Sequence, residues 1–267
     1  MGNLKLINKV AKLHFKITLQ QDMAFRIDFF GKLLNTILAV VGNIAGILIL
    51  FSQVNTINGW GLYETLTVTG VFMFVQSLKN LVIAPSLSSI SGLGGELWTG
   101  SFDFTLLKPL PTQLYISLRN WSPFSIIDVI LSLIIMGISV FNISSNISVI
   151  NILLFLFALL MGLVILYSVM LLMTSAAFWY LGTPLLWIFD SFMELGRYPV
   201  RIYPTFIKNI LTWIIPVGLI VTVPAEALLG GIDLKRIIIG IIFAIIIYFI
   251  STKVFKISLK KYSSASS

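Results

Sequence analysis

The chain has 267 residues, of which 58% are hydrophobic and only 10% are charged, and its mean hydropathy is +1.01. Soluble domains carry about 25% charged residues, so this composition indicates an integral membrane protein. The absence of cysteine excludes disulfides and thiolate chemistry, and the single histidine, His14, excludes a multi-histidine metal site. The length suits one polytopic domain without an additional soluble ATPase or receptor domain.

The first expected element is an amphipathic helix over residues 1–28, which carry too many charges to span a membrane. Its lysines and its apolar residues recur at helical spacing: Lys5, Lys9, Lys12 and Lys16, and one residue later Leu6, Val10, Leu13 and Ile17. A basic edge beside an apolar face suits a helix that lies on an anionic membrane surface. The alternative is an ordinary solvated helix.

Six apolar stretches follow, each close to the roughly 20 residues that a membrane-spanning helix needs. They cover residues 29–51, 60–84, 115–141 (or 121–141), 149–173, 206–223 and 234–254. Pro216 and Gly218 interrupt the fifth, and the stretch after it combines one acid, Glu226, with a glycine pair. We therefore predict an all-α membrane protein, with six transmembrane helices in a domain over 29–257 and a tail over 258–267.

The distribution of basic residues predicts the orientation of these spans. Six crossings place both termini on one side, and the positive-inside rule places the more basic side in the cytoplasm. The N-terminal segment and the tail are basic, and Arg197, Arg201 and Lys208, between the fourth and fifth spans, are predicted on the same side of the membrane. Lys235 and Arg236, at the start of the sixth span, are the exceptions, because they are predicted on the other side. The termini are therefore predicted to be cytoplasmic, and the net charge of +8 reflects topology rather than nucleic-acid binding.

Residues 92–111, between the second and third spans, form the clearest interior segment that does not span the membrane. Glycines open it, Ser101 is a suitable N-cap, and Pro109 ends it. Phe102 and Leu106 lie four residues apart, so a short helix here has a narrow apolar face. That face needs the membrane surface or another protein as its partner.

Acidic residues in or beside membrane spans are the first functional candidates. Glu64 falls near the outer end of the second span and Asp128 in the inner third of the third span. For Asp128, a role in transport and a structural hydrogen bond are both open. Asp190, Glu194 and Arg197 recur at helical spacing, which predicts an ion-pair ladder at the cytoplasmic edge.

The sequence contains no arrangement of residues that is typical of an enzyme active site. The lone histidine lies in the N-terminal segment, and the GxxxxGK[ST] loop that cradles ATP phosphates is missing. We therefore predict no catalytic residue, no metal site and no cofactor in this chain.

Three groups of residues carry a resemblance that extends over essentially the whole chain. They are Gly100–Leu110, Ala177–Tyr180, and the proline-containing series Tyr198-Pro199, Tyr203-Pro204, Ile215-Pro216 and Val223-Pro224-Ala225 with Leu228-Leu229-Gly230. In this order and spacing they resemble the permease subunit of a bacterial type-2 ATP-binding-cassette (ABC) exporter, of an uncharacterised subfamily.

The resemblance implies a role for each segment. The central helix would be the coupling helix that docks into a groove of the ATPase, through Gly100, Phe102, Asp103, Leu106, Leu107, Lys108 and Pro109. The N-terminal amphipathic helix would lie along the membrane. The broken segment would re-enter from outside as an outer gate, with Pro216, Pro224, Glu226 and Gly230.

The resemblance also implies partners. Two copies of an ABC ATPase would carry ATP and Mg²⁺, and a second permease, paralogous or identical, would face this one in the lipid of the cell inner (plasma) membrane. An apolar path suits a hydrophobic or amphipathic cargo such as a drug, lipid or peptide. Two competing interpretations are an ion- or proton-coupled carrier, which needs an essential deep acid, and a non-transporting membrane assembly or immunity protein, for which ATP hydrolysis is dispensable.

Overall fold

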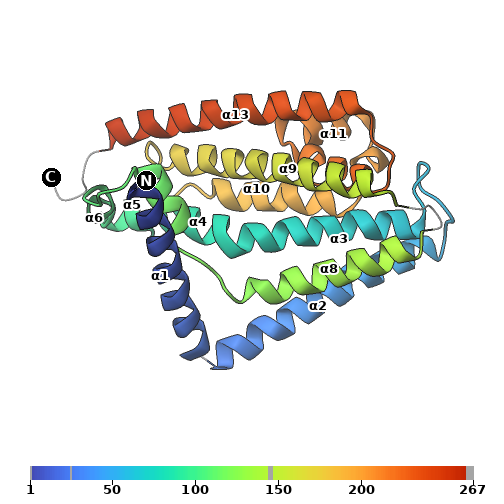
Figure 1. Cartoon of the computed structure of the whole chain (residues 1–267), viewed down its shortest axis with the longest axis horizontal. Coiled ribbons are helices and arrows are strands. Elements are labelled where there is room, and N and C mark those ends of the chain that lie inside the picture. The colour runs from blue at the N-terminus through green and yellow to red at the C-terminus, as the bar shows by residue number, and fades with distance from the viewer. Residues whose placement is uncertain (1, 25, 144–146, 263–267) are drawn as a thin grey trace.

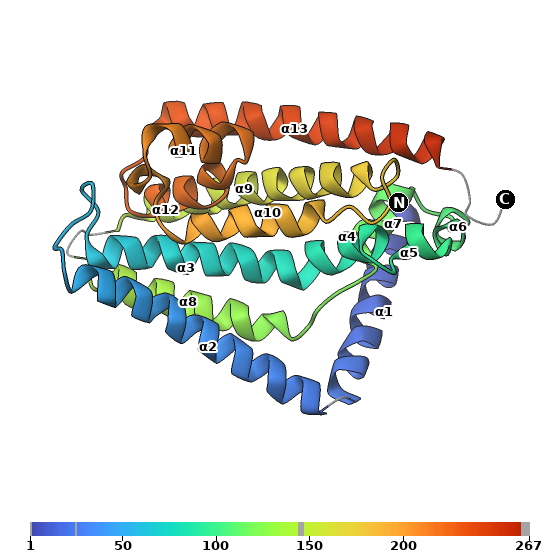
Figure 2. The same ribbon diagram turned by 180° about the vertical axis from the view of Figure 1, so that it is seen from behind.

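The computed structural model describes residues 2–24, 26–143 and 147–262. Most of its long helices run along one common axis (Figure 1). The described residues form no strand beyond an isolated bridge between Ile57 and Trp60, which confirms the all-α class. The helix α1 (Gly2–Ala24) lies across the direction of the other long helices (Figures 1 and 2). It contacts the bundle through edge-to-face ring pairs of His14 with Tyr115 and of Phe15 with Trp121.

The remaining elements follow in two runs. The first run is α2 (Arg26–Phe51), α3 (Leu62–Leu78), the π turn η1 (Lys79–Ile83), α4 (Ala84–Ser91), α5 (Glu96–Thr99), α6 (Phe102–Leu106), α7 (Thr112–Leu118) and α8 (Ser125–Phe141). The second run is α9 (Val149–Ala176), α10 (Leu185–Met193), the 3₁₀ turns η2 (Glu194–Arg197) and η3 (Val200–Ile202), α11 (Thr205–Asn209), the π turns η4 (Ile210–Ile214) and η5 (Gly218–Thr222), α12 (Val223–Leu228) and α13 (Leu234–Lys261).

Four helical stretches of the described chain are long and apolar enough to cross a membrane. They are Phe30–Phe51, Leu62–Thr99, Val149–Ala176 and Leu234–Lys261, and a fifth is added if the bent pair Thr205–Ile214 and Gly218–Leu228 counts as one span. They agree with the predicted first, second, fourth and sixth spans, while the total of six stays a prediction. The third stretch is shorter than predicted, because α7 is a separate helix and α8 begins at Ser125.

The long helix α9 lies at the centre of the bundle. It packs against α13, α12 and α4, and buried side chains occur along it from Phe155 to Ser175. At Gly162 an added Cβ would lie 2.9 Å from the carbonyl oxygen of Ile220, so the missing side chain lets η5 approach the backbone of α9. This close approach places η5 and α12 inside the bundle.

Residues 185–202 lead the chain from one end of the bundle to the other. Three contacts with α3 and η1 mark this antiparallel path: Lys79 with Asp190, Gln76 with Glu194, and Thr69 with the carbonyl of Arg197. At the end of the path, Asn58 donates a hydrogen bond of 3.3 Å to the carbonyl oxygen of Arg201. We call this end, with η3 and α12, the α12 end, and the opposite end, with α5 and α6, the α6 end.

The bent pair of residues 205–228 enters and leaves at the α12 end. Its two halves meet at 79° around Pro216. Glu226 forms ion pairs of 2.9 Å with Arg201 and with Arg236, so the approach to the hairpin, its last helix and the start of α13 lie together. The prediction that residues 206–223 run from one end of the bundle to the other is therefore corrected, because they lie in a longer hairpin that begins and ends at the α12 end.

The error has a physical reason. The proline-broken stretch is as apolar as a span and was therefore predicted as one. The segment that does run along the bundle was not recognised, because α10 has only nine residues and carries the charged Asp190, which pairs with Lys79. The side chains of Arg201 and Lys208, which the sequence placed on the cytoplasmic side, consequently lie at the α12 end with Arg236. Lys260 and Lys261, in the last turn of α13, lie at the α6 end (Figure 1), and the cytoplasmic orientation of this end stays a prediction from the positive-inside rule.

Candidate functional site

At the α6 end, the segment 92–111 forms the short helices α5 and α6. Gly100 joins them with φ of +73°, a left-handed conformation that glycine adopts without steric cost. Ser101 precedes α6, but its hydroxyl makes no capping hydrogen bond and lies 2.8 Å from the hydroxyl of Thr99. Ser101 therefore occupies the predicted N-cap position without making the capping hydrogen bond, and the turn depends on the glycine.

Phe102 is completely buried within the chain. Its ring meets those of Phe178 and Tyr262 edge to face, with 5.3 Å between the ring centroids in each pair. Phe178 belongs to the Ala177–Tyr180 motif, so the cluster ties the segment to the end of α9 and to the residue after α13. Phe102 has no surface left for a partner, and its predicted anchoring role is corrected to one in the core.

Other apolar side chains of the segment face away from the bundle. Phe104 is 69% and Leu107 is 80% exposed, and Leu93, Trp98 and Leu106 are exposed as well. We call Leu93, Trp98, Phe104, Leu106 and Leu107 the α6 surface. Lys108 and Pro109 continue this exposed side, and Asp103 is half-buried. Apolar side chains gathered at the end of a helical bundle, rather than along its membrane-facing sides, indicate an interaction site.

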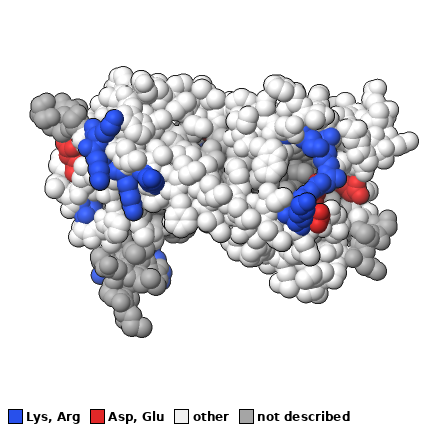
Figure 3. Space-filling model, turned by 90° about the horizontal axis from the view of Figure 1, so that it is seen from above, with Lys and Arg blue, Asp and Glu red and all other residues white. Residues whose placement is uncertain are grey.

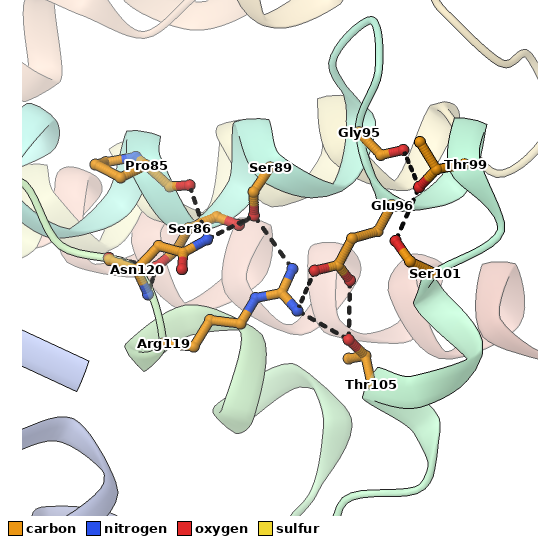
Figure 4. A network of polar contacts seen from close by, with 10 residues as sticks. All are labelled: Pro85, Ser86, Ser89, Gly95, Glu96, Thr99, Ser101, Thr105, Arg119 and Asn120. Carbon is orange, nitrogen blue, oxygen red and sulfur yellow. Dashed lines mark hydrogen bonds and ion pairs between the residues drawn. The ribbon is translucent and has the colours of Figure 1, made fainter. Parts of the chain in front are cut away.

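A buried ion pair fixes this segment to the bundle (Figure 4). Arg119, which follows α7 and is 5% exposed, pairs with Glu96 of α5 at 2.6 Å between Nη1 and Oε1. The same nitrogen donates to the hydroxyl of Thr105 in α6 at 2.8 Å, and Nη2 donates to the hydroxyl of Ser89 in α4 at 3.1 Å. One guanidinium group therefore connects α4, α5, α6 and α7.

The neighbouring Asn120 extends this network. Its side-chain Nδ2 donates to Ser89 Oγ at 2.9 Å, and its backbone carbonyl oxygen accepts from Ser86 Oγ at 2.8 Å (Figure 4). The pair of Glu96 and Arg119 was not predicted, because the two residues are far apart in the chain and no motif connects them. The available signal was that Glu96 is an acid in an otherwise apolar stretch, directly after a glycine pair.

Two of the predicted acids, Glu64 and Asp190, have interaction partners within the chain. Glu64 accepts a hydrogen bond of 2.9 Å from the backbone N–H three residues earlier, which caps α3. Asp190 pairs with the buried Lys79 at 2.7 Å, instead of joining a ladder with its neighbours. Of the predicted ladder, the structure confirms the ion pair between Glu194 and Arg197.

A polar cavity of about 530 Å³ lies between α2, α3, α8 and η2. Asp128 lines it and accepts a hydrogen bond of 2.7 Å from Thr36 of α2. Its other polar walls include Asn35, Asn43, Gln76, Asn80, Glu194 and Arg197. Within the described part of the chain, Arg197 Nε and Gln76 Oε1 are buried without a hydrogen-bond partner. Such polar groups among membrane helices are costly and mark pathways for substrates or ions.

The four residues predicted for an outer gate all lie in or beside the re-entrant hairpin. Pro216 is buried at the bend, Pro224 lies in the first turn of α12, and Glu226 is buried with its two arginine partners. Gly230 follows α12 with φ of +75°, and a Cβ there would lie 3.0 Å from the amide nitrogen of Asn151 in α9. The structure thus brings these residues into one hairpin, and their gating role stays a prediction.

The bundle, its polar cavity and its exposed α6 surface together define a multi-pass membrane protein built to contact a further protein. A family model described as ABC-2 family transporter protein matches residues 37–266. The chain therefore belongs to the ABC-2 transporter family and is a transmembrane permease component of an ABC transporter. No curated protein matches the chain.

Proposed function

We propose that this chain exports a hydrophobic or amphipathic substrate, such as a drug, lipid or peptide, by alternating access driven by a separate ATPase. Two ATPase copies bind ATP and Mg²⁺, and one of them docks on the α6 surface of this chain. The protein lies in the cell inner membrane, with the α6 end and both termini in the cytoplasm. The observation that carries the proposal is the α6 surface itself, since it is apolar, exposed and held in place by Arg119.

The second support is the location of the polar cavity beside a poorly covered helix. Only 11% of the apolar window in Phe30–Phe51 is buried inside the chain, although Asn35 and Asn43 of the same helix line the cavity. A second permease, identical or paralogous, that packs against α2 would cover this face and enclose the cavity between the two subunits. The cavity then forms half of the substrate path.

Docking of the ATPase is tested by making the α6 surface charged. We expect the double variant Phe104→Glu, Leu107→Glu to lose the ATPase in a pull-down of the tagged chain from its native cell in mild detergent, because buried charges without partners oppose an apolar interface. Lys256→Glu, an exposed change in α13, serves as the control and is expected to retain the ATPase. Retention of the ATPase by the double variant would exclude this surface as the docking site.

The proton-coupled alternative is tested at Asp128, because this acid lines the cavity. The amide of Asp128→Asn keeps the hydrogen bond to Thr36 but cannot carry a proton between the two sides. If ATP drives transport, we expect the variant to transport within about fivefold of the wild type, because the hydrogen bond is kept and a neutral hydrogen bond is only about 1 kcal/mol weaker than a charged one. Complete loss of transport, with the ATPase still bound, would favour the proton-coupled carrier.

A further inference from the structure

A second pocket, of about 210 Å³, lies at the α12 end between the re-entrant hairpin, η3 and α13. Three basic side chains line it, Arg201, Lys208 and Arg236, together with one acid, Glu226. The pocket therefore carries two more positive charges than negative ones. Basic side chains gather at this end on the face seen in Figure 3, separated by an uncharged band from those of the α6 end.

Glu226 organises the basic residues of the pocket. The residue is 4% exposed, and its carboxylate forms two ion pairs of 2.9 Å, from Oε1 to Arg201 Nε and from Oε2 to Arg236 Nη1. The two guanidinium groups are thus held side by side, while each is nearly half exposed and keeps further N–H donors for a ligand. Two fixed guanidinium groups match the geometry of a phosphate or carboxylate.

Lys208 lies in the wall of this pocket without a close partner. Among the described residues it forms no hydrogen bond or ion pair through its side chain, and it interacts with Glu226 only by longer-range attraction. The position of these cations is not explained by topology either, because basic residues at the end opposite the cytoplasm oppose the positive-inside rule. An excess of positive charge around a pocket is stabilised when an anion binds there.

The remaining wall of the pocket combines the polar side chains of Asn209, Thr212 and Thr222 with a larger apolar part. Trp213, Leu219, Val223 and Ile239 contribute to the apolar part. Trp213 is half exposed, and its ring contacts Phe243 of α13 edge to face. A free inorganic anion makes no favourable contact with this apolar wall, whereas the acyl chain of an amphiphile packs against it.

The geometry points to a binding site for an anionic amphiphile in this pocket, with its phosphate or carboxylate on Arg201, Arg236 and Lys208 and its chain against Trp213. The site goes beyond the proposed transport role and requires no ATPase. The anionic group can come from a membrane phospholipid or from free phosphate, and the apolar wall selects the former. The isolated permease chain is therefore sufficient for the test.

The test uses the fluorescence of Trp213 in the full chain reconstituted in nanodiscs. Phosphatidylglycerol or phosphatidylcholine with brominated chains is added at equal mole fraction, and the Trp213→Phe variant gives the contribution of the other tryptophans. We expect Trp213 to be quenched preferentially by phosphatidylglycerol. Lys208→Gln should weaken this preference about fivefold, since one basic residue beside an anionic headgroup contributes about 1 kcal/mol.

Four comparisons make the test decisive. Lys208→Arg should keep the preference for phosphatidylglycerol, and so should Lys253→Gln, an exposed change in the distal half of α13. Equal quenching by the two lipids in the wild type would overturn the site. Displacement of the brominated phosphatidylglycerol by millimolar inorganic phosphate would overturn its amphiphilic character, because a free anion would then suffice.

Discussion

Replacement of Arg119 by methionine is expected to destabilise the protein by about 3–5 kcal/mol, the cost of removing one partner from a buried ion pair. The side chain volume is largely kept, but Glu96 loses its counter-ion and the hydroxyls of Thr105 and Ser89 lose a donor. The measurement is the thermal unfolding midpoint in detergent. Arg119→Lys should be intermediate, because an ammonium group keeps the charge without the forked geometry.

The control for this prediction is Lys108→Met, which removes an exposed cation from the same segment. Its unfolding midpoint should stay within the error of the wild type, as for most surface substitutions. An Arg119→Met protein as stable as the wild type would show that the network of Figure 4 does not hold the segment.

The second large effect is expected for Phe102→Ala, with a loss of about 3–5 kcal/mol in stability from the cavity left in the aromatic cluster. Phe104→Ala, two residues further along the same short helix, is the matched comparison because its ring is exposed. We expect it to leave the unfolding midpoint unchanged and to weaken capture of the ATPase. The two phenylalanines thus separate folding from docking.

An opposite result would reverse these assignments. If Phe102→Ala unfolds like the wild type and loses the ATPase, the ring of Phe102 turns outward in the assembled transporter and the sequence-based expectation of an anchor stands. Measuring unfolding and pull-down on the same two preparations distinguishes the outcomes.

The long apolar helices could be predicted because their composition alone determines them. α9 and α13 are apolar over more residues than a membrane crossing needs, whatever surrounds them. The path through residues 185–202 could not be predicted in this way. Its polar groups are compatible with the bundle only because Lys79, Gln76 and Thr69 of α3 and η1 provide partners, and such partners are a property of the tertiary structure.

The candidate site shows the same division. Helical spacing identified Phe102 and Leu106 as neighbours on one face, but spacing does not tell whether that face meets the rest of the chain or the solvent. Phe102 turned inward and Leu107 outward. The contact of Arg119 with Glu96 depends on the fold of four helices and leaves no periodic pattern in the sequence. The residues predicted for the gate could be assigned to one broken segment because proline and glycine interrupt a helix locally.

The Arg119 network also has a mechanical consequence. Since one guanidinium group connects α4, α5, α6 and α7, a push on α6 displaces these four helices as a rigid body. Bending must then be absorbed where they join the longer helices. The two joints are the π turn η1, between α3 and α4, and the stretch around Pro123, between α7 and α8. π turns interrupt regular α-helical hydrogen bonding and are frequent at functional positions. These joints would act as hinges, so that a displacement of the α6 end is converted into a rotation of α3 and α8, two walls of the polar cavity.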